Sequence, residues 1–273
     1  MNFKKIELIF FIAFILLDIF LFASYMQKDD LVESTVSSAS SNDTTSILKS
    51  IKGDQITVGS LSDKKSSGYY LAAAADKDEL KNDAQKLRDA LWSYNSSSHR
   101  LTVIFEDRIK LANPKKPAQT IDKLIKNSTR VINGSQYVYD RSLSTKNTIV
   151  YIQQVHKVPI YSTNAQVCFN LKKNYVVGYT QRYVPETEIL KSKKPIISQK
   201  RAVIWLYQYN KLVNNSEIKW VKLGYTKLLS ANDSVIYIPT WVLAVESKSS
   251  GSVQYRRINA FTGAYMNTDA VLH

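Results

Sequence analysis

The sequence is poor in the residues that build disulfides and metal sites. It has one cysteine, Cys168, and three histidines, His99, His156 and His273. A lone cysteine excludes an intramolecular disulfide, and histidines this far apart lack the spacing of zinc ligands, so we expect no metal centre. Cys168 lies in a strand-like segment, QVCFNL, which predicts a buried and unreactive thiol rather than a reactive one.

Motifs of catalysis are missing as well. With only eight glycines, the chain has no glycine-rich phosphate loop, and it has neither a G-x-S-x-G nor an H-E-x-x-H motif. The adjacent carboxylates Glu106 and Asp107 end a predicted strand, where neighbouring residues point to opposite faces, so solvent exposure is favoured over acid–base catalysis. These absences predict a protein that is not an enzyme and needs no cofactor.

What the sequence has in excess is positive charge. Lysine and arginine number 37 against 23 acidic residues, which gives a formal charge of +14. Such an excess favours acidic surroundings, namely nucleic acid, anionic lipid or anionic wall polymer. The hydrophobic fraction of 44% is sufficient for a folded core, so the chain is not predicted to be disordered.

Residues 6–26 are predicted to form a transmembrane signal anchor. The apolar run IELIFFIAFILLDIFLFASY is about as long as a helix needs to cross the hydrocarbon core. A signal peptide cleaved after Ala23 is the alternative, but the run is long and its end is bulky for one. Two lysines in the short tail 1–5 predict a cytoplasmic N-terminus, with everything beyond the span outside the cell. That topology argues against nucleic acid as a partner.

Asp18 is unusual inside this run. A carboxylate near the centre of a span costs about 2.5–3.5 kcal/mol on insertion scales. At about 100° per residue, Glu7 and Asp18 share one side of the helix, and Phe14 and Tyr25 fall on the same line. We interpret these four residues, the polar stripe, as a contact with a partner helix, because intramembrane carboxylates usually face one. The alternative is a protonated Asp18 that a strongly apolar helix tolerates.

The remainder predicts an extracytoplasmic α+β ectodomain. Residues 27–46 are rich in Ser, Thr, Asp and Asn and are interpreted as a flexible linker. Two units follow, 47–190 and 191–273, each with a helix packed on an antiparallel sheet. The charged, proline-terminated segment 186–195 marks the boundary between them.

Three helices are predicted within this ectodomain. The first follows Asp76 as N-cap, and the second covers residues 118–127. The third begins after Ser198 as N-cap. The first apolar face comprises Leu80, Ala84, Leu87 and Leu91, and the third comprises Ala202, Trp205, Leu206, Tyr209 and Val213. Strands are expected within 101–105, 136–139, 148–153, 159–170, 175–183, 217–229, 235–245 and 254–260.

Aromatic and basic residues offer candidate binding surfaces. Seventeen tyrosines and four tryptophans could anchor an interface, or they could fill a thin two-layer core. The segment 151–160 could form a hairpin whose edge pairs with another chain. Clusters of lysine and arginine are expected on solvated faces, where they could hold the ectodomain against anionic lipid or wall polymer.

The N-terminus also follows a recognisable pattern. Phe3, Lys4, Ile6, Glu7, Ile9 and Phe10 lead into the span, which closes with Leu17, Asp18, Ile19, Phe20 and Leu21. This resembles the YycI (WalI) family, membrane-anchored regulators of the WalK–WalR (YycG–YycF) two-component system of Gram-positive bacteria. The length, the polar linker and the tyrosine-rich ectodomain agree over essentially the whole chain. The ending 255–265 is similar over a short stretch to the close of PepSY-like domains.

The resemblance implies a non-enzymatic regulator of cell-wall metabolism with PepSY/YycH-like ectodomain units. YycI-like proteins associate with a YycH-like protein and with the sensor histidine kinase WalK (YycG), largely through transmembrane helices. A second hypothesis is a tethered PepSY-like module that binds or inhibits a cell-envelope ligand or peptidase. A third hypothesis, an envelope hydrolase, needs a catalytic site assembled from residues distant in the sequence.

Overall fold

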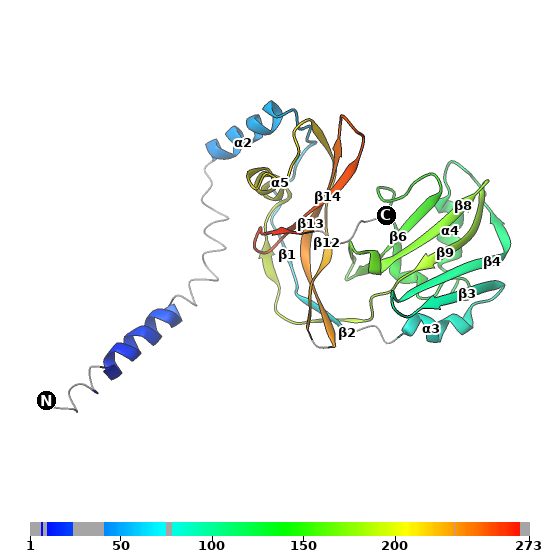
Figure 1. Cartoon of the computed structure of the whole chain (residues 1–273), viewed down its shortest axis with the longest axis horizontal. Helices are drawn as coiled ribbons and strands as arrows, with labels where there is room; N and C mark the ends of the chain where they lie inside the picture. Colours follow the sequence, from blue (N-terminus) through cyan, green and yellow to red (C-terminus); the bar gives the residue numbers. More distant parts are fainter. Residues whose placement is uncertain (1–6, 8–9, 24–40, 75–77, 232, 268–273) are drawn as a thin grey trace. The chain divides into compact units, whose positions relative to one another are not determined.

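A computed structural model describes residues 7, 10–23, 41–74, 78–231 and 233–267 (Figure 1). The chain divides into two compact units, residues 1–53 and 54–273, which are described separately.

The first unit contains two helical segments, residues 10–23 and α2 (Ser41–Gly53). The predicted span 6–26 is described only in part, because positions 6, 8–9 and 24–26 lie outside the described residues. Among the described helices, none combines the length and the hydropathy that a membrane crossing requires. Residues 41–46, the end of the predicted linker, belong to α2. The rest of that linker lies outside the described residues.

A seven-stranded antiparallel sheet takes up the middle of the sequence of the second unit. Its strand order is β3-β4-β9-β8-β6-β5, and the short β7 pairs with β6. The strands are β3 (Ala90–Asn95), β4 (Arg100–Lys110), β5 (Tyr137–Tyr139), β6 (Thr148–Val155), β7 (Val158–Pro159), β8 (Gln166–Lys172) and β9 (Tyr175–Gln181). This sheet is flanked by helices α3 (Glu79–Asp83) and α4 (Ala118–Ile125) and by the 3₁₀ turns η1 (Ala84–Lys86), η2 (Gly134–Gln136) and η3 (Thr163–Ala165).

One buried cluster joins the two helices to this sheet. Leu80 of α3 and Ile121 of α4 are fully buried with Phe169 and Tyr179 of the sheet. The rings of Phe169 and Tyr179 lie 5.4 Å apart, within the range of favourable aromatic pairs. Both helices therefore cover the same face of the sheet, which is the predicted helix-on-sheet layering.

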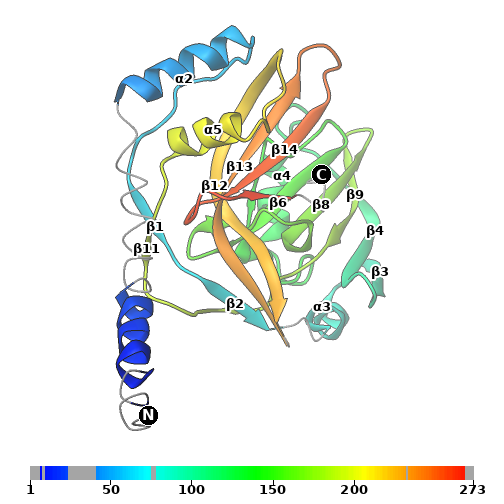
Figure 2. The ribbon, with the colours of Figure 1, turned by 60° about the vertical axis from the view of Figure 1, so that its left-hand side comes forward.

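A six-stranded antiparallel sheet forms the other part of the second unit. Its order is β10-β2-β13-β14-β15, with β12 along the other side of β13. The strands are β2 (Leu71–Ala74), β10 (Thr187–Ile189), β12 (Ser216–Ala231), β13 (Ser234–Ser247), β14 (Val253–Asn259) and β15 (Tyr265–Met266). A separate two-stranded ribbon joins β1 (Ser66–Gly68) to β11 (Lys194–Ile196). Helix α5 (Gln199–Gln208) lies against β12 (Figure 2).

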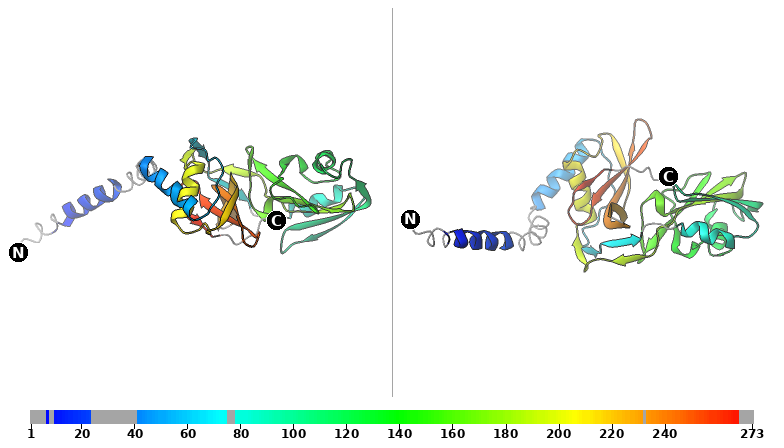
Figure 3. Two further views of the ribbon diagram at one scale, coloured as in Figure 1. Left: turned by 90° about the horizontal axis from the view of Figure 1, so that it is seen from above. Right: turned by 60° about the horizontal axis from the view of Figure 1, so that its bottom comes forward.

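Strand pairing crosses the predicted boundary at residue 190. β2 and β10 precede that boundary, yet β2 pairs with both β10 and β13. The whole seven-stranded sheet lies in sequence between β2 and β10, so it is an insertion into the six-stranded sheet. Figure 3 shows the two sheets side by side, one mainly green and the other orange to red. The division into 47–190 and 191–273 does not describe this connectivity.

The first predicted helix is wrong in length. α3 ends at Asp83, Leu87 is already extended, and β3 begins at Ala90. Leu80, Ala84 and Leu87 are buried as expected, whereas Leu91 is 67% exposed because it lies on β3 opposite Ile104. The pairing of β3 with β4 satisfies backbone groups that the longer helix would have used. The proposed N-cap, Asp76, lies outside the described residues.

The helix predicted after Ser198 is confirmed. The Ser198 hydroxyl accepts a hydrogen bond from the Arg201 backbone N–H, as an N-cap should. Its buried residues are Ala202, Val203, Ile204 and Leu206. Tyr209 and Val213 are exposed instead, because α5 ends at Gln208 and the periodicity no longer applies to them.

Candidate functional site

The polar stripe lies on the N-terminal segment. Glu7, Phe14 and Asp18 are exposed, and Tyr25 lies outside the described residues. Phe14 and Asp18 are both on the helix of residues 10–23, one turn apart. The partner contact assigned to this stripe stays a prediction.

The two sheets of the second unit meet through an aromatic cluster. Tyr161 stacks on Trp220 at 5.9 Å, and Trp220 lies 5.8 Å from Tyr255. Buried residues around them are Leu143, Val150, Ile152, Cys168 and Val242. Several tyrosines thus fill the core, which was one of the two alternatives left open by the sequence. Cys168 is buried as predicted, and burial raises the pKa of its thiol to about 11.

The edge of the predicted hairpin 151–160 is occupied within the chain. β6 and β7 do form this hairpin, with a tight turn at His156 and Lys157, both at positive φ. Beyond β7, Ile160 forms a parallel bridge with Tyr225 of β12, and the Tyr161 N–H donates to the Tyr225 carbonyl at 2.8 Å. This edge joins the two sheets and is not free for another chain at these positions.

A buried ion pair reinforces the same junction. Asp140, which follows β5, is only 5% exposed, and its two carboxylate oxygens lie 3.1 and 3.0 Å from the Lys222 ammonium of β12. Ser142 and Tyr161 also donate hydrogen bonds to this carboxylate. The Lys222 ammonium lies 4.9 Å from the centre of the Trp220 ring. The arrangement ties the seven-stranded sheet to the six-stranded one.

Opposing effects set the pKa of Asp140. Burial raises it, but the hydrogen bonds from Ser142 and Lys222 and the charge of Lys222 outweigh burial and lower the pKa of Asp140 below its ordinary value. A carboxyl group whose pKa is lower in the folded chain than in the unfolded chain stabilises the fold at any pH above its unfolded-state pKa. This stabilisation is lost as the pH falls through the folded-state pKa.

We expect Asp140→Asn to lower the free energy of unfolding by about 1–2 kcal/mol at neutral pH. The expected loss is this small because Lys222 is partly exposed, so solvent screens its charge. The difference from wild type should shrink in acid, as pH falls through the lowered pKa of Asp140. Urea titrations at several pH values, followed by tryptophan fluorescence, measure it. The matched control is Asp89→Asn, which removes an ion pair to Arg130 from a carboxylate that is 60% exposed and should cost less than about 0.5 kcal/mol. Equal losses in both variants, or a loss independent of pH, would contradict the assignment.

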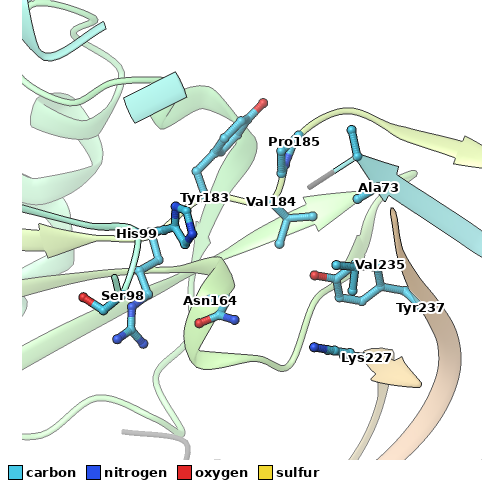
Figure 4. Close-up of a pocket in the computed structure, with 12 residues that line it drawn as sticks. Ala73, Ser98, His99, Asn164, Tyr183, Val184, Pro185, Lys227, Val235 and Tyr237 are labelled. Atoms are coloured by element: carbon cyan, nitrogen blue, oxygen red, sulfur yellow. The ribbon is translucent and has the colours of Figure 1, made fainter. Parts of the chain in front are cut away.

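A second feature between the sheets is a polar pocket of about 280 Å³. The seven-stranded side supplies the β3–β4 turn with Ser98 and His99, the η3 residue Asn164, and the connection 182–185. The six-stranded side supplies Ala73, Ala74, Lys227, Val235 and Tyr237. Figure 4 shows Asn164 between His99 on one side and Lys227 on the other. The His99 ring is held by Tyr94, at 3.2 Å, and Asp78, at 3.4 Å.

Sequence reasoning placed His99 in a polar turn and did not single out Arg182, Lys227 or Asn164. These residues come from separate strands and connections, so no local spacing signals them. Glu106 and Asp107, by contrast, are both exposed on β4, in agreement with the solvated position predicted for them.

Comparison with known proteins gives one family match. The model of the family described as "YycI protein" matches residues 34–261, and no curated protein matches the sequence. Similar solved structures include an uncharacterized protein from Eubacterium rectale (11% identity, TM-score 0.45, 78% of this chain and 89% of that one). YycH from Bacillus subtilis has 11% identity and TM-score 0.45, covering 77% of this chain and 61% of its own. The Bacillus megaterium YpeB C-terminal domain has 15% identity and TM-score 0.37, covering 83% of this chain and 95% of its own.

The family match includes all strands of both sheets up to β14, the aromatic junction and the whole lining of the pocket. The chain belongs to the YycI family, regulators in the WalK two-component pathway.

Proposed function

We propose that this protein is a non-enzymatic, membrane-anchored regulator of a WalK-type sensor histidine kinase that controls cell-wall metabolism. It acts together with a YycH-like partner, through its transmembrane helix and through extracytoplasmic contacts. The observation that carries this proposal is the family match over residues 34–261.

The apolar run 6–25 supports the membrane part of the proposal. Its length and the lysines before it favour a single span with a cytoplasmic N-terminus and an extracytoplasmic ectodomain. In this arrangement the polar stripe of Glu7, Phe14, Asp18 and Tyr25 is the contact with a helix of the kinase or of the YycH-like partner. The net charge of +14 suits an ectodomain that lies close to anionic lipid or wall polymer.

Replacing the span tests the proposal. A chain in which residues 6–26 are exchanged for an unrelated single-pass helix of the same orientation should reach the membrane and fold, yet lose regulation of the kinase. Co-purification of the kinase from solubilised membranes and expression of the genes that depend on it are the two measurements. If a released ectodomain, residues 47–273, restores normal kinase output, the tethered binding module of PepSY type becomes the better hypothesis.

A further inference from the structure

The pocket between the two sheets is positively charged. His99, Arg182 and Lys227 all line it, and its described lining contains no aspartate or glutamate. Within the described part of the chain, neither Arg182 nor Lys227 forms an ion pair, whereas His99 is already held by Asp78. Two cations that face one small cavity without a carboxylate repel each other, and an anion between them would relieve that repulsion.

Arg182 has the least satisfied of these side chains. Its Nε is buried and has no hydrogen-bond partner among the described residues. Burial and the nearby Arg100 guanidinium lower the pKa of Arg182, against a smaller opposing effect of Cys168. A buried donor without an acceptor is costly, and no described group offsets the charge of this guanidinium. The enclosed Nε is itself out of reach, so the donors left for an oxyanion in the pocket are the terminal N–H groups of the same guanidinium.

The backbone holds Arg182 in place. The Arg182 N–H donates to the Gln166 carbonyl at 3.0 Å, and the Tyr137 hydroxyl donates to the Arg182 carbonyl at 2.8 Å. Two residues later, the buried Gln153 side chain accepts from the Val184 N–H at 2.8 Å and donates to its carbonyl at 2.7 Å. This wall of the pocket is therefore preorganised, which reduces the entropy lost when a ligand binds.

The rest of the lining is apolar. Ala73, Val184, Pro185, Val235 and the ring of Tyr237 form it, beside the polar side chains of Ser98 and Asn164. A volume of about 280 Å³ is at the small end of ligand pockets, and it suits one or two amino-acid residues rather than a folded domain.

We propose that this pocket binds the carboxylate of a small ligand that carries a short apolar group, such as the C-terminus of a short peptide. The Arg182 guanidinium and the Lys227 ammonium hold the carboxylate. The Asn164 amide donates to the same end of the ligand, and the apolar group packs on Val184 and Val235. A planar guanidinium pairs with a carboxylate through two parallel hydrogen bonds, which gives the site its orientation.

Calorimetric titration of the full chain in nanodiscs of uncharged lipid tests this proposal. The probes are N-acetyl-alanyl-alanine, its C-terminal amide, and inorganic phosphate. We expect the acid to bind with a Kd of roughly millimolar or tighter, as its small size allows. The amide and phosphate should bind at least about tenfold more weakly, because the first lacks the charge and the second the apolar group.

Two variants and a control locate the binding. Arg182→Gln and Lys227→Gln should each raise the Kd of the acid about tenfold or more. Lys146→Gln removes an exposed lysine outside the pocket lining and should leave the Kd unchanged. Because Lys227 is exposed, its variant is expected to fold even if the Arg182 variant does not.

Three outcomes would overturn the proposal: no binding of the acid, equal binding of acid and amide, or binding of phosphate as tight as that of the acid. An unchanged Kd in Lys227→Gln would also overturn it. The titration contains no kinase, so its failure leaves the proposed regulatory function untouched, and a failed span exchange leaves this site untouched.

Discussion

Asp18→Leu is expected to leave the protein in the membrane and folded, while roughly 3- to 30-fold less kinase co-purifies with it. This range corresponds to the roughly 0.6–2 kcal/mol measured for interhelical polar contacts in membranes. The substitution also removes the insertion cost of a buried carboxylate, so the amount of protein in the membrane should not fall. Quantitative co-purification from solubilised membranes, normalised to the amount of this protein, measures the effect.

A matched double variant distinguishes the effect of the carboxylate's position on the helix from the effect of the span's overall composition. Asp18→Leu combined with Leu16→Asp keeps the hydropathy of the span but moves the carboxylate by about 200°, to the opposite side of the helix. We expect it to behave like Asp18→Leu, whereas Asp18→Asn, which retains hydrogen bonding, should keep most of the kinase. If the double variant recovers as much kinase as wild type, the polar stripe is not a contact surface.

Gly263→Ala is expected to destabilise the ectodomain strongly. Gly263 has φ +70°, and a Cβ at this position would overlap the Cζ3 and Cε3 atoms of Trp205 on α5. Left-handed backbone strain and the displaced indole ring together should lower the free energy of unfolding by about 2–5 kcal/mol. Urea unfolding followed by fluorescence measures it, because all four tryptophans lie in the second unit.

Gly251 provides a close control for this prediction. It has φ +67°, and its N–H donates to the carbonyl four residues earlier at 2.8 Å, as does that of Gly263. A Cβ at Gly251 would meet no atom within 4 Å. Gly251→Ala should therefore cost only about 1–2 kcal/mol, the strain alone. Equal losses in the two variants would show that the contact with Trp205 contributes nothing.

Local patterns predicted local structure well. Each strand-rich run expected from the sequence contains a strand, and Ser198 caps its helix as predicted. The helix after Asp76 was predicted too long because Leu91 continues a helical spacing by coincidence. Leu91 instead lies on β3, where it pairs with Ile104 of β4. The spacing of apolar residues along the sequence does not predict this tertiary contact.

The candidate sites differ in how far the sequence could predict them. The polar stripe needs one helix only, so spacing suffices to define it. The pocket needs Ser98, Asn164, Arg182 and Lys227, which come together because β9 leads out of one sheet and β12 belongs to the other. Neither residue type nor spacing distinguishes Arg182 from the other basic residues. What distinguishes it is the combination of a buried Nε without a hydrogen-bond partner and a place in the pocket lining, which only the fold reveals.

The insertion of one sheet into the other also sets an order of assembly. All seven strands of the inserted sheet lie between residues 90 and 181, so they are complete while the last third of the chain is still being synthesised. β2 is made earlier still and can pair with β10 once that strand exists, whereas its other partner, β13, begins only at Ser234. Until then its other edge is open to wrong partners. A chain interrupted before β13 would therefore carry a finished inserted sheet beside an unprotected strand, and a nascent chain passes through that same stage each time it is made.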